Sequence, residues 1–141
     1  MDVSAQPKLM FHGVDFVNLK LDTIQQYNNQ ASIDFNVEPK VFYPEDAPNF
    51  FKIFMEVSVN CENYFHLNLV GIGVFEFDKE FENVELKKTF INTNAPAIMF
   101  PYVRSFITTL TSNLGNVTGS LVIPTQFFQG NLPEFTIDTE E

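Results

Sequence analysis

Apolar and polar residues alternate between positions 50 and 60, and this alternation constrains the fold more than any other part of the sequence. A period of two places the apolar side chains on one face of a β-strand, because successive residues point to opposite faces. Residues 61–63 have the length of a tight hairpin turn, and residues 65–77 continue as a second, largely apolar strand. In that strand, Gly71 and Gly73 indicate a bulge or a close backbone approach. The pattern predicts an antiparallel hairpin whose first strand has five core residues: Phe51, Ile53, Met55, Val57 and Val59.

Two more strands are expected before this hairpin, within residues 9–21 and 33–37. Their apolar members alternate with polar residues, as in a half-buried strand. A polar connection at 23–30 lies between them, and three prolines mark residues 39–49 as a loop. The alternating apolar residues are Val17, Leu19 and Leu21 in the first strand, and Ile33, Phe35 and Val37 in the second.

One helical segment follows, with Asn94 as its expected N-cap and Gly115 as its expected stop. Charged residues of both signs fill the connection 76–88 before it. Arg104, the only arginine, stands on this mostly apolar helix, and a permanent planar cation there predicts a specific charge-assisted contact. Pairing with nearby acids on the helix surface is the alternative. Apolar residues recur at helical spacing: Val103, Phe106, Ile107, Leu110 and Leu114.

The charge balance excludes several classes of partner. Eighteen Asp and Glu against eight Lys and Arg give a net charge of −10, which repels nucleic acid and anionic membrane surfaces. The sequence has no apolar run of the roughly 18 residues that a membrane helix needs. Cys61 is the only cysteine, and the N-terminal residues lack the features of a signal peptide. We therefore expect a cytoplasmic protein of one domain, residues 1–141, with loose arms at 1–8 and 130–141.

The motifs that would indicate catalysis are missing from the sequence. His12 and His66 lie far apart, and the acids between 76 and 85 lack the spacing of a calcium loop. The sequence therefore predicts no enzyme, no cofactor and no metal site. The 17 phenylalanines indicate more apolar surface than one core uses, which is typical of oligomer contacts or of a hydrophobic ligand.

Residues 94–112 resemble the first long helix of the SecB family of bacterial protein-export chaperones. The family's Pro-x-Ile-x-Phe-Pro-Tyr-x-Arg pattern stands here as Pro96, Ile98, Phe100, Pro101, Tyr102 and Arg104. The resemblance spans about residues 9 to 128 and implies an α+β fold, a four-stranded antiparallel sheet with one long helix packed on one face. It also implies a homo-oligomer, either a dimer or a homotetramer built as a dimer of dimers. Its downstream part, similar to Leu-x-Pro-x-Asn-Phe, is carried by Leu121, Pro124 and Phe127.

The resemblance implies an ATP-independent chaperone that binds non-native polypeptides and keeps preproteins unfolded for translocation. Apolar burial is non-directional, so binding of low sequence specificity is expected. By position, the implied polypeptide-binding residues are Ile33, Phe35, Val37, Phe127 and Phe128. The first three also fit the core face of a strand, and both interpretations remain open. The implied oligomer contacts are Tyr102, Val103, Phe106, Ile107 and Leu110.

The family docks its export motor ATPase through acids on the outward sheet face. The matching positions here are Asn18, Asp22 and Asn68, so Asp22 is the one acidic docking candidate and docking on the motor stays open. Gln129, Gly130 and Pro133 also break the second helix that the family forms after the first. The alternative hypothesis is a SecB-fold interaction protein with one dedicated protein partner, for example in a toxin–antitoxin system, that does not act in export.

Overall fold

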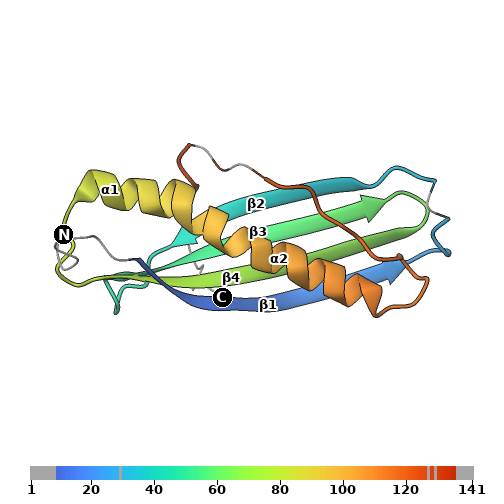
Figure 1. The fold of residues 1–141 in the computed structure, drawn as a ribbon, viewed down its shortest axis with the longest axis horizontal. Coiled ribbons are helices and arrows are strands. Elements are labelled where there is room, and N and C mark those ends of the chain that lie inside the picture. Colours follow the sequence, from blue (N-terminus) through green and yellow to red (C-terminus); the bar gives the residue numbers. More distant parts are fainter. Residues whose placement is uncertain (1–8, 29, 127, 129, 136–141) are drawn as a thin grey trace, which may run out of the picture.

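The computed structural model describes residues 9–28, 30–126, 128 and 130–135. Four antiparallel strands form one sheet in the order β1-β4-β3-β2, and a helical rod lies across one face of it (Figure 1). The strands are β1 (Leu9–Thr23), β2 (Asp34–Phe42), β3 (Phe50–Cys61) and β4 (Phe65–Phe77). The rod consists of α1 (Val84–Thr89), a π-helical turn η2 (Phe90–Asn94) and α2 (Ala95–Ser112). This arrangement confirms the expected four-stranded antiparallel sheet with one long helix on one face.

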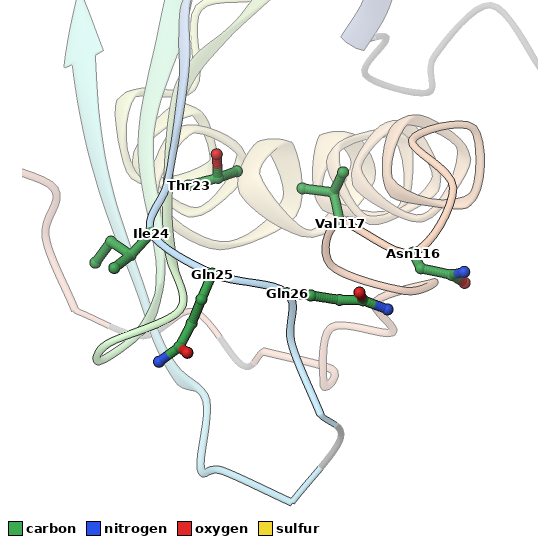
Figure 2. Close-up of a pocket in the computed structure, with 6 residues that line it drawn as sticks. All are labelled: Thr23, Ile24, Gln25, Gln26, Asn116 and Val117. Atoms are coloured by element: carbon green, nitrogen blue, oxygen red, sulfur yellow. The ribbon is translucent and has the colours of Figure 1, made fainter.

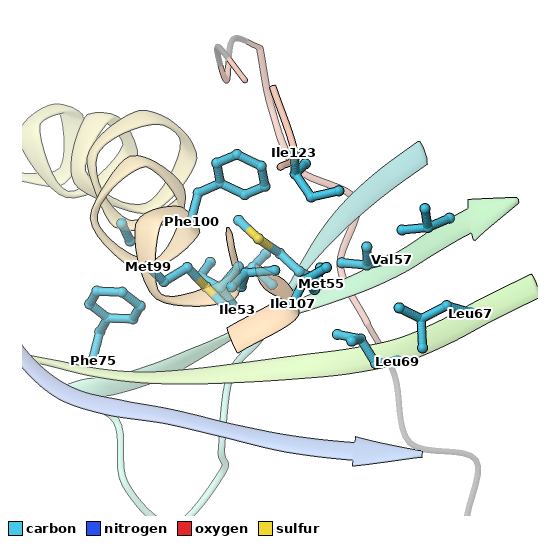
Figure 3. Close-up of a cluster of buried hydrophobic side chains, with 14 of the residues drawn as sticks. Ile53, Met55, Val57, Leu67, Leu69, Phe75, Met99, Phe100, Ile107 and Ile123 are labelled. Carbon is cyan, nitrogen blue, oxygen red and sulfur yellow. The ribbon is translucent and has the colours of Figure 1, made fainter. Parts of the chain in front are cut away.

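The core lies between α2 and the two central strands (Figure 3). All five predicted core residues of β3 are buried, and β4 contributes Leu67, Leu69 and Phe75 from the neighbouring strand. Met99, Val103 and Ile107 come from α2 at intervals of four residues, so one stripe of the helix covers this apolar face. Complete burial of such a side chain contributes about 1.5–3 kcal/mol, so this stripe fixes the helix on the sheet.

Glycines in β4 let the helix approach closely. A Cβ added at Gly73 would lie 2.9 Å from Met99 Sδ, and one added at Gly71 would lie 3.4 Å from Val103 Cγ2. Of the two expectations for these glycines, the close approach is therefore confirmed. The alternative, a bulge, is not found here, because the β3–β4 register runs without a shift.

The bulges lie in β1 instead, and they correct the expected strand phase. Its register against β4 shifts between Phe11 and Val14 and again between Val17 and Lys20. Gly13 and Asn18 adopt positive φ angles of +103° and +54° at these shifts. Because each extra residue resets the alternation, Val17 and Leu19 are exposed, contrary to the prediction. The residues of β1 that pack on the core are Leu9, Phe11, Val14, Phe16 and Leu21.

The helical rod begins earlier than the sequence predicted. Asn83 is the N-cap, and its Oδ1 accepts a hydrogen bond of 3.0 Å from Leu86 N. Asn94 makes no side-chain cap and lies inside the rod, at the end of η2. Pro96 lacks the N–H that an uninterrupted α-helix uses, and the hydrogen-bond pattern changes immediately before it, with Ala95 N–H donating to Phe90 O.

The end of the described chain returns to the sheet and pairs with the edge of β2. Val41 N–H donates to Pro133 O at 3.0 Å, and Phe135 N–H donates to Val41 O at 2.6 Å. The expectation of a loose arm from residue 130 is therefore wrong for residues 133–135, because two backbone hydrogen bonds hold them. The predicted loop at 39–49 also begins later, since β2 continues through Pro39 to Phe42. No helix in the described part of the chain is long and apolar enough to cross a membrane.

Candidate functional site

An extended segment leaves the end of α2 and runs back along the helix on its β2 side (Figure 1). We call residues 116–124 the return segment. Three polar side chains of α2 bond its backbone: Arg104 Nε donates to Ile123 O at 2.8 Å and Thr108 Oγ1 donates to Leu121 O at 2.7 Å. Thr111 Oγ1 accepts from Leu121 N at 2.9 Å. The side chains at 104, 108 and 111 share one face of the helix, so they form a ladder that fixes the return segment.

This ladder gives Arg104 the specific charge-assisted contact that the sequence predicted. The acceptor is a backbone carbonyl within the same chain. Thr108 and Thr111 are residues that sequence reasoning missed. Their spacing from Arg104 on a mostly apolar helix was the available signal, since polar residues at such intervals lie on a common face.

The return segment and the β1–β2 connection enclose two hollows that lie next to each other along both segments. The first, of about 320 Å³, is lined by Thr23–Gln26 on one side and by Asn116 and Val117 on the other (Figure 2). The second, of about 610 Å³, is lined by Tyr27, Ile33, Phe35 and Val59 together with residues 118–124. Consecutive residues of the same two segments line both hollows, so we treat them as one groove.

Among the residues that the structure describes, those lining this groove carry no charged side chain, although the chain has a net charge of −10. Its polar groups are the amides and hydroxyls of residues such as Gln25, Asn116 and Ser120. Apolar side chains with a few uncharged polar groups are typical of surfaces that bury an apolar ligand. The groove can therefore accept apolar groups without desolvating a charge.

Tyr27 fixes the connection that forms one wall of the groove. Its ring meets Tyr64 and Phe65 edge-on, at centroid distances of 5.8 and 5.7 Å. Its hydroxyl donates to Ala31 O at 3.1 Å, and Asn28 Nδ2 donates to the Tyr64 hydroxyl at 2.9 Å. Although this connection is short, these contacts give it a defined conformation and an aromatic face.

Only some of the predicted polypeptide-binding residues line the groove. Ile33 and Phe35 line the groove, whereas Val37 is half-buried on β2 beyond the two hollows. Phe35 and Phe128 both pack on Phe100, at centroid distances of 6.5 and 5.7 Å, so one ring of α2 brings them together. Sequence reasoning had placed Phe100 only in the helix motif. The fifth predicted residue, Phe127, lies outside the described residues.

The backbone of β2 offers an open edge beside the groove. Val41 uses both its N–H and its C=O on residues 133–135, so these groups point away from β3. Because strand backbones alternate with a period of two, the N–H and C=O groups of Phe35 and Val37 point to the same open side. Within the described ranges they have no backbone partner there. The site thus combines an apolar hollow with a strand edge that can accept another strand.

Two of the predicted oligomer contacts are buried inside the protomer. Val103 and Ile107 are both 0% exposed beneath α2, so their side chains are not available to a second copy. The spacing of the apolar residues did not show which of them face the sheet and which lie on the flanks of the helix. Tyr102 is 54% exposed, and Phe106 and Leu110 are half-buried, so these three remain on the flank of the helix.

The docking candidate Asp22 lies near the end of β1, opposite His66 of β4. Its carboxylate is 3.7 Å from Lys20 Nζ, and both side chains are largely exposed. Asn18 lies in the second bulge and Asn68 pairs with Lys20. Of the three matching positions, one carries a carboxylate, and a lysine neutralises it locally.

The groups with catalytic potential are dispersed. His12 Nε2 lies 2.9 Å from Glu76 Oε1 on the sheet face away from α2, far from the groove. Cys61 is buried, and burial together with the charge of Asp34 raises the pKa of its thiol, which disfavours the reactive thiolate. Among the residues that the structure describes, no three His, Cys, Asp or Glu side chains are grouped as metal ligands.

Known proteins share this fold and part of this sequence. An uncharacterized protein of Methanocaldococcus jannaschii is 25% identical over 105 residues, which is 71% of this chain and 66% of that protein, just under two thirds of its length. A SecB-like chaperone of Mycobacterium tuberculosis, solved in complex with a ChAD peptide from an antitoxin, superposes with a TM-score of 0.60 at 14% identity. That superposition covers 94% of this chain and 88% of the other.

A protein of unknown function from Streptococcus agalactiae superposes with a TM-score of 0.46 at 12% identity, over 86% of this chain and 100% of that one. The family model described as preprotein translocase subunit SecB matches residues 12–124. Because this match covers most of the sequence, the chain belongs to the SecB family.

Proposed function

We propose that this protein is an ATP-independent chaperone that binds non-native polypeptides in the groove between the β1–β2 connection and the return segment. SecB family chaperones are not enzymes. One observation carries the proposal: an uncharged groove lies beside an open strand edge in a strongly acidic chain. An unfolded polypeptide offers apolar side chains and unpaired backbone groups, and this site can bind both.

The two parts of the site contribute differently to recognition. Apolar burial contributes about 25 cal/mol per Å² and has no directional requirement, so the hollows accept many apolar side chains. Strand addition to Phe35 and Val37 uses only backbone groups, which every client possesses. We therefore expect binding of extended apolar segments with little dependence on sequence.

We also propose that the protein assembles as a dimer or homotetramer through the flank of α2 that carries Tyr102, Phe106 and Leu110. Ile98, 39% exposed on the same helix, adds to this apolar surface. Exposed apolar patches on a folded protomer are typical of protein contacts. Assembly would place several grooves in one particle and would lengthen the surface that a client chain can contact.

A dedicated partner is the second candidate function. The superposed chaperone of Mycobacterium tuberculosis carries an antitoxin peptide, which favours a peptide of one partner protein as the ligand. The isolated, lysine-paired Asp22 provides little basis for docking on an export motor. The dedicated-partner hypothesis predicts tight binding of one segment, whereas the general chaperone hypothesis predicts similar affinities for many unfolded chains.

A matched pair of charge substitutions tests the groove. Val122 lines it and is 74% exposed, and Val84 of α1 lies outside it and is 61% exposed. Val122→Asp should weaken binding of a reduced, unfolded client by about tenfold, which corresponds to about 1.4 kcal/mol. The Val84→Asp variant has the same composition and net charge as the Val122→Asp variant, and it should bind like the wild type.

Titration by fluorescence anisotropy, with native mass spectrometry for stoichiometry, measures the effect. Equal affinities of the two variants for several unfolded clients would contradict binding in the groove. A single tight ligand, with no binding of unrelated clients, would favour the dedicated partner. Export is a separate proposal, which binding of the oligomer to a translocation motor would test.

A further inference from the structure

Residues 131–135 lie at the end of the described chain and cross the edge of the sheet. We call this segment the strap. Asn92, in the π-helical turn, holds its first part. Leu132 N–H donates to Asn92 Oδ1 at 2.8 Å, and Asn92 Nδ2 lies 3.3 Å from Asn131 Oδ1. The same Nδ2 donates to Lys88 O at 2.9 Å, which fixes the orientation of the amide. The π-helical turn thus carries a side chain that fastens the strap to the rod.

The second part of the strap occupies the β2 edge as a short parallel strand. Glu134 forms a parallel bridge with Val41, through hydrogen bonds of 3.0 and 2.6 Å made by Pro133 O and Phe135 N. The Phe135 ring then stacks on Phe54 of β3, with a centroid distance of 4.5 Å and an interplanar angle of 9°. The strap therefore passes from the helix side of the sheet to its opposite face.

Pro39 separates this occupied part of the edge from the open part. Residues 35, 37, 39 and 41 turn their backbone groups to the same side, but proline has no N–H to donate. Upstream of it, Phe35 and Val37 face outward without a backbone partner in the described part of the chain. Downstream of Pro39, the backbone N–H and C=O of Val41 are hydrogen-bonded to the strap. The open edge therefore holds about five residues of an added strand, the span from Phe35 to Pro39.

We propose that the strap sets the length of client backbone that the β2 edge can hold, by occupying the edge beyond Pro39. This inference rests on the proposed binding of polypeptides in the groove. A client strand longer than the open span must compete with the strap for Val41 and for the Phe54 ring. The strap is tethered to the same edge, so its effective concentration there is high and it competes efficiently. The ligand that fits is a short extended segment with alternating apolar residues.

Peptides of graded length test this limit. We would measure the affinity of full-length protein for alternating apolar peptides of about five, eight and eleven residues, which span roughly 17 to 36 Å when extended. Wild-type affinity should rise no further beyond the five-residue peptide. The double variant Asn92→Ala with Phe135→Ala, which releases the strap, should bind the longest peptide about tenfold more tightly than the shortest.

The control is Asn94→Ala with Phe50→Ala. Asn94 lies in the same π-helical turn without a side-chain cap, and Phe50 is a half-buried ring of β3 away from the strap. This control should show the wild-type dependence on length. Hydrogen exchange at the amide of residue 135 reports release directly, since that N–H bonds Val41 in the wild type. If the double variant retains protection there, Phe135→Pro removes the donor itself and serves as the released variant.

The outcomes separate the strap from the groove. Identical length dependence in wild-type and released proteins, with exchange confirming release, would overturn the role of the strap and leave the groove intact. An affinity that rises with peptide length only after release would support the strap as the limit on length. If no peptide binds to either protein, polypeptide binding itself is overturned, and the role of the strap with it.

Discussion

The two flanks of α2 hold their neighbours by different means. Toward β1, Phe106 stacks on Phe16 at 4.1 Å and Tyr102 packs on Phe11 at 5.1 Å, so aromatic rings fill the space. Toward β2, Phe100 packs on Phe35 and Phe128. Further along the helix, the Arg104–Thr111 ladder binds only the backbone of the return segment, and the 610 Å³ hollow lies beyond it. Ring packing closes a surface, whereas a narrow extended segment fixed by hydrogen bonds leaves room beside it. The larger hollow therefore lies on the flank that the return segment covers.

The largest effect is expected between these flanks, at Ile107. Its side chain is 0% exposed against the sheet. Ile107→Ala leaves a cavity and should lower the free energy of unfolding by about 2–5 kcal/mol, measured by urea denaturation. A change below about 1 kcal/mol would show that the helix does not seal the core as the structure indicates.

On the β1 flank, Tyr102→Asp should disrupt the proposed oligomer. A carboxylate at an apolar contact loses hydration without a partner, so dissociation should be complete at micromolar concentrations. Native mass spectrometry measures the oligomeric state, and the control is Ala97→Asp, at an exposed position of the same helix that lies about 140° around its axis from Tyr102. If both variants keep the wild-type mass, the proposed interface is wrong.

On the β2 flank, Thr108→Val removes one rung of the ladder with little change of shape. The loss of the hydrogen bond to Leu121 O should cost about 1 kcal/mol in unfolding free energy, less than the change at Ile107. Hydrogen exchange at the Leu121 amide should become faster, because the return segment is held less firmly. Unchanged exchange would mean that Arg104 and Thr111 suffice to hold it.

The smallest expected effect is a change in the pH dependence of stability, through Tyr43 and the strap residue Glu134. Partial burial, together with the charge of Glu134, raises the pKa of Tyr43 above its ordinary value of 10.0. A raised pKa means that folding favours the neutral phenol, so this contribution is present below about pH 10 and is lost as the pH rises through the higher folded value. Tyr43→Phe should therefore reduce the loss of stability above pH 10. Identical alkaline profiles by thermal denaturation would contradict this coupling.

Much of the sheet and the helix was predictable because local pattern and tertiary role agree there. The alternation in β3 survives intact, since both of its neighbours pair with it without a register shift. The alternation read in β1 failed at Val17 and Leu19, because two bulges change the phase and a period of two contains no information about inserted residues. Asn83 was missed as the cap because the charged residues 76–88 were interpreted as a connection, whereas a π-helical turn joins a short helix there to α2.

The candidate site was predictable only in part. Ile33 and Phe35 were named from position in the family, and both line the groove. Phe100, the return segment and the strap were not, because each acquires its role from residues distant in the sequence. Phe35, Phe100 and Phe128 converge only when β2, α2 and the chain end are placed together.

The sequence alone determined the strands, the long helix, the acidic composition and membership of the SecB family. These features follow from local periodicity, composition and motif, which operate over a few residues. Only the tertiary structure decided that Val103 and Ile107 face the sheet, that Arg104 bonds a backbone carbonyl and that residues 133–135 close one part of the β2 edge. The physical reason is that these contacts join segments far apart in the chain, and which partner each side chain meets depends on packing that no local pattern encodes.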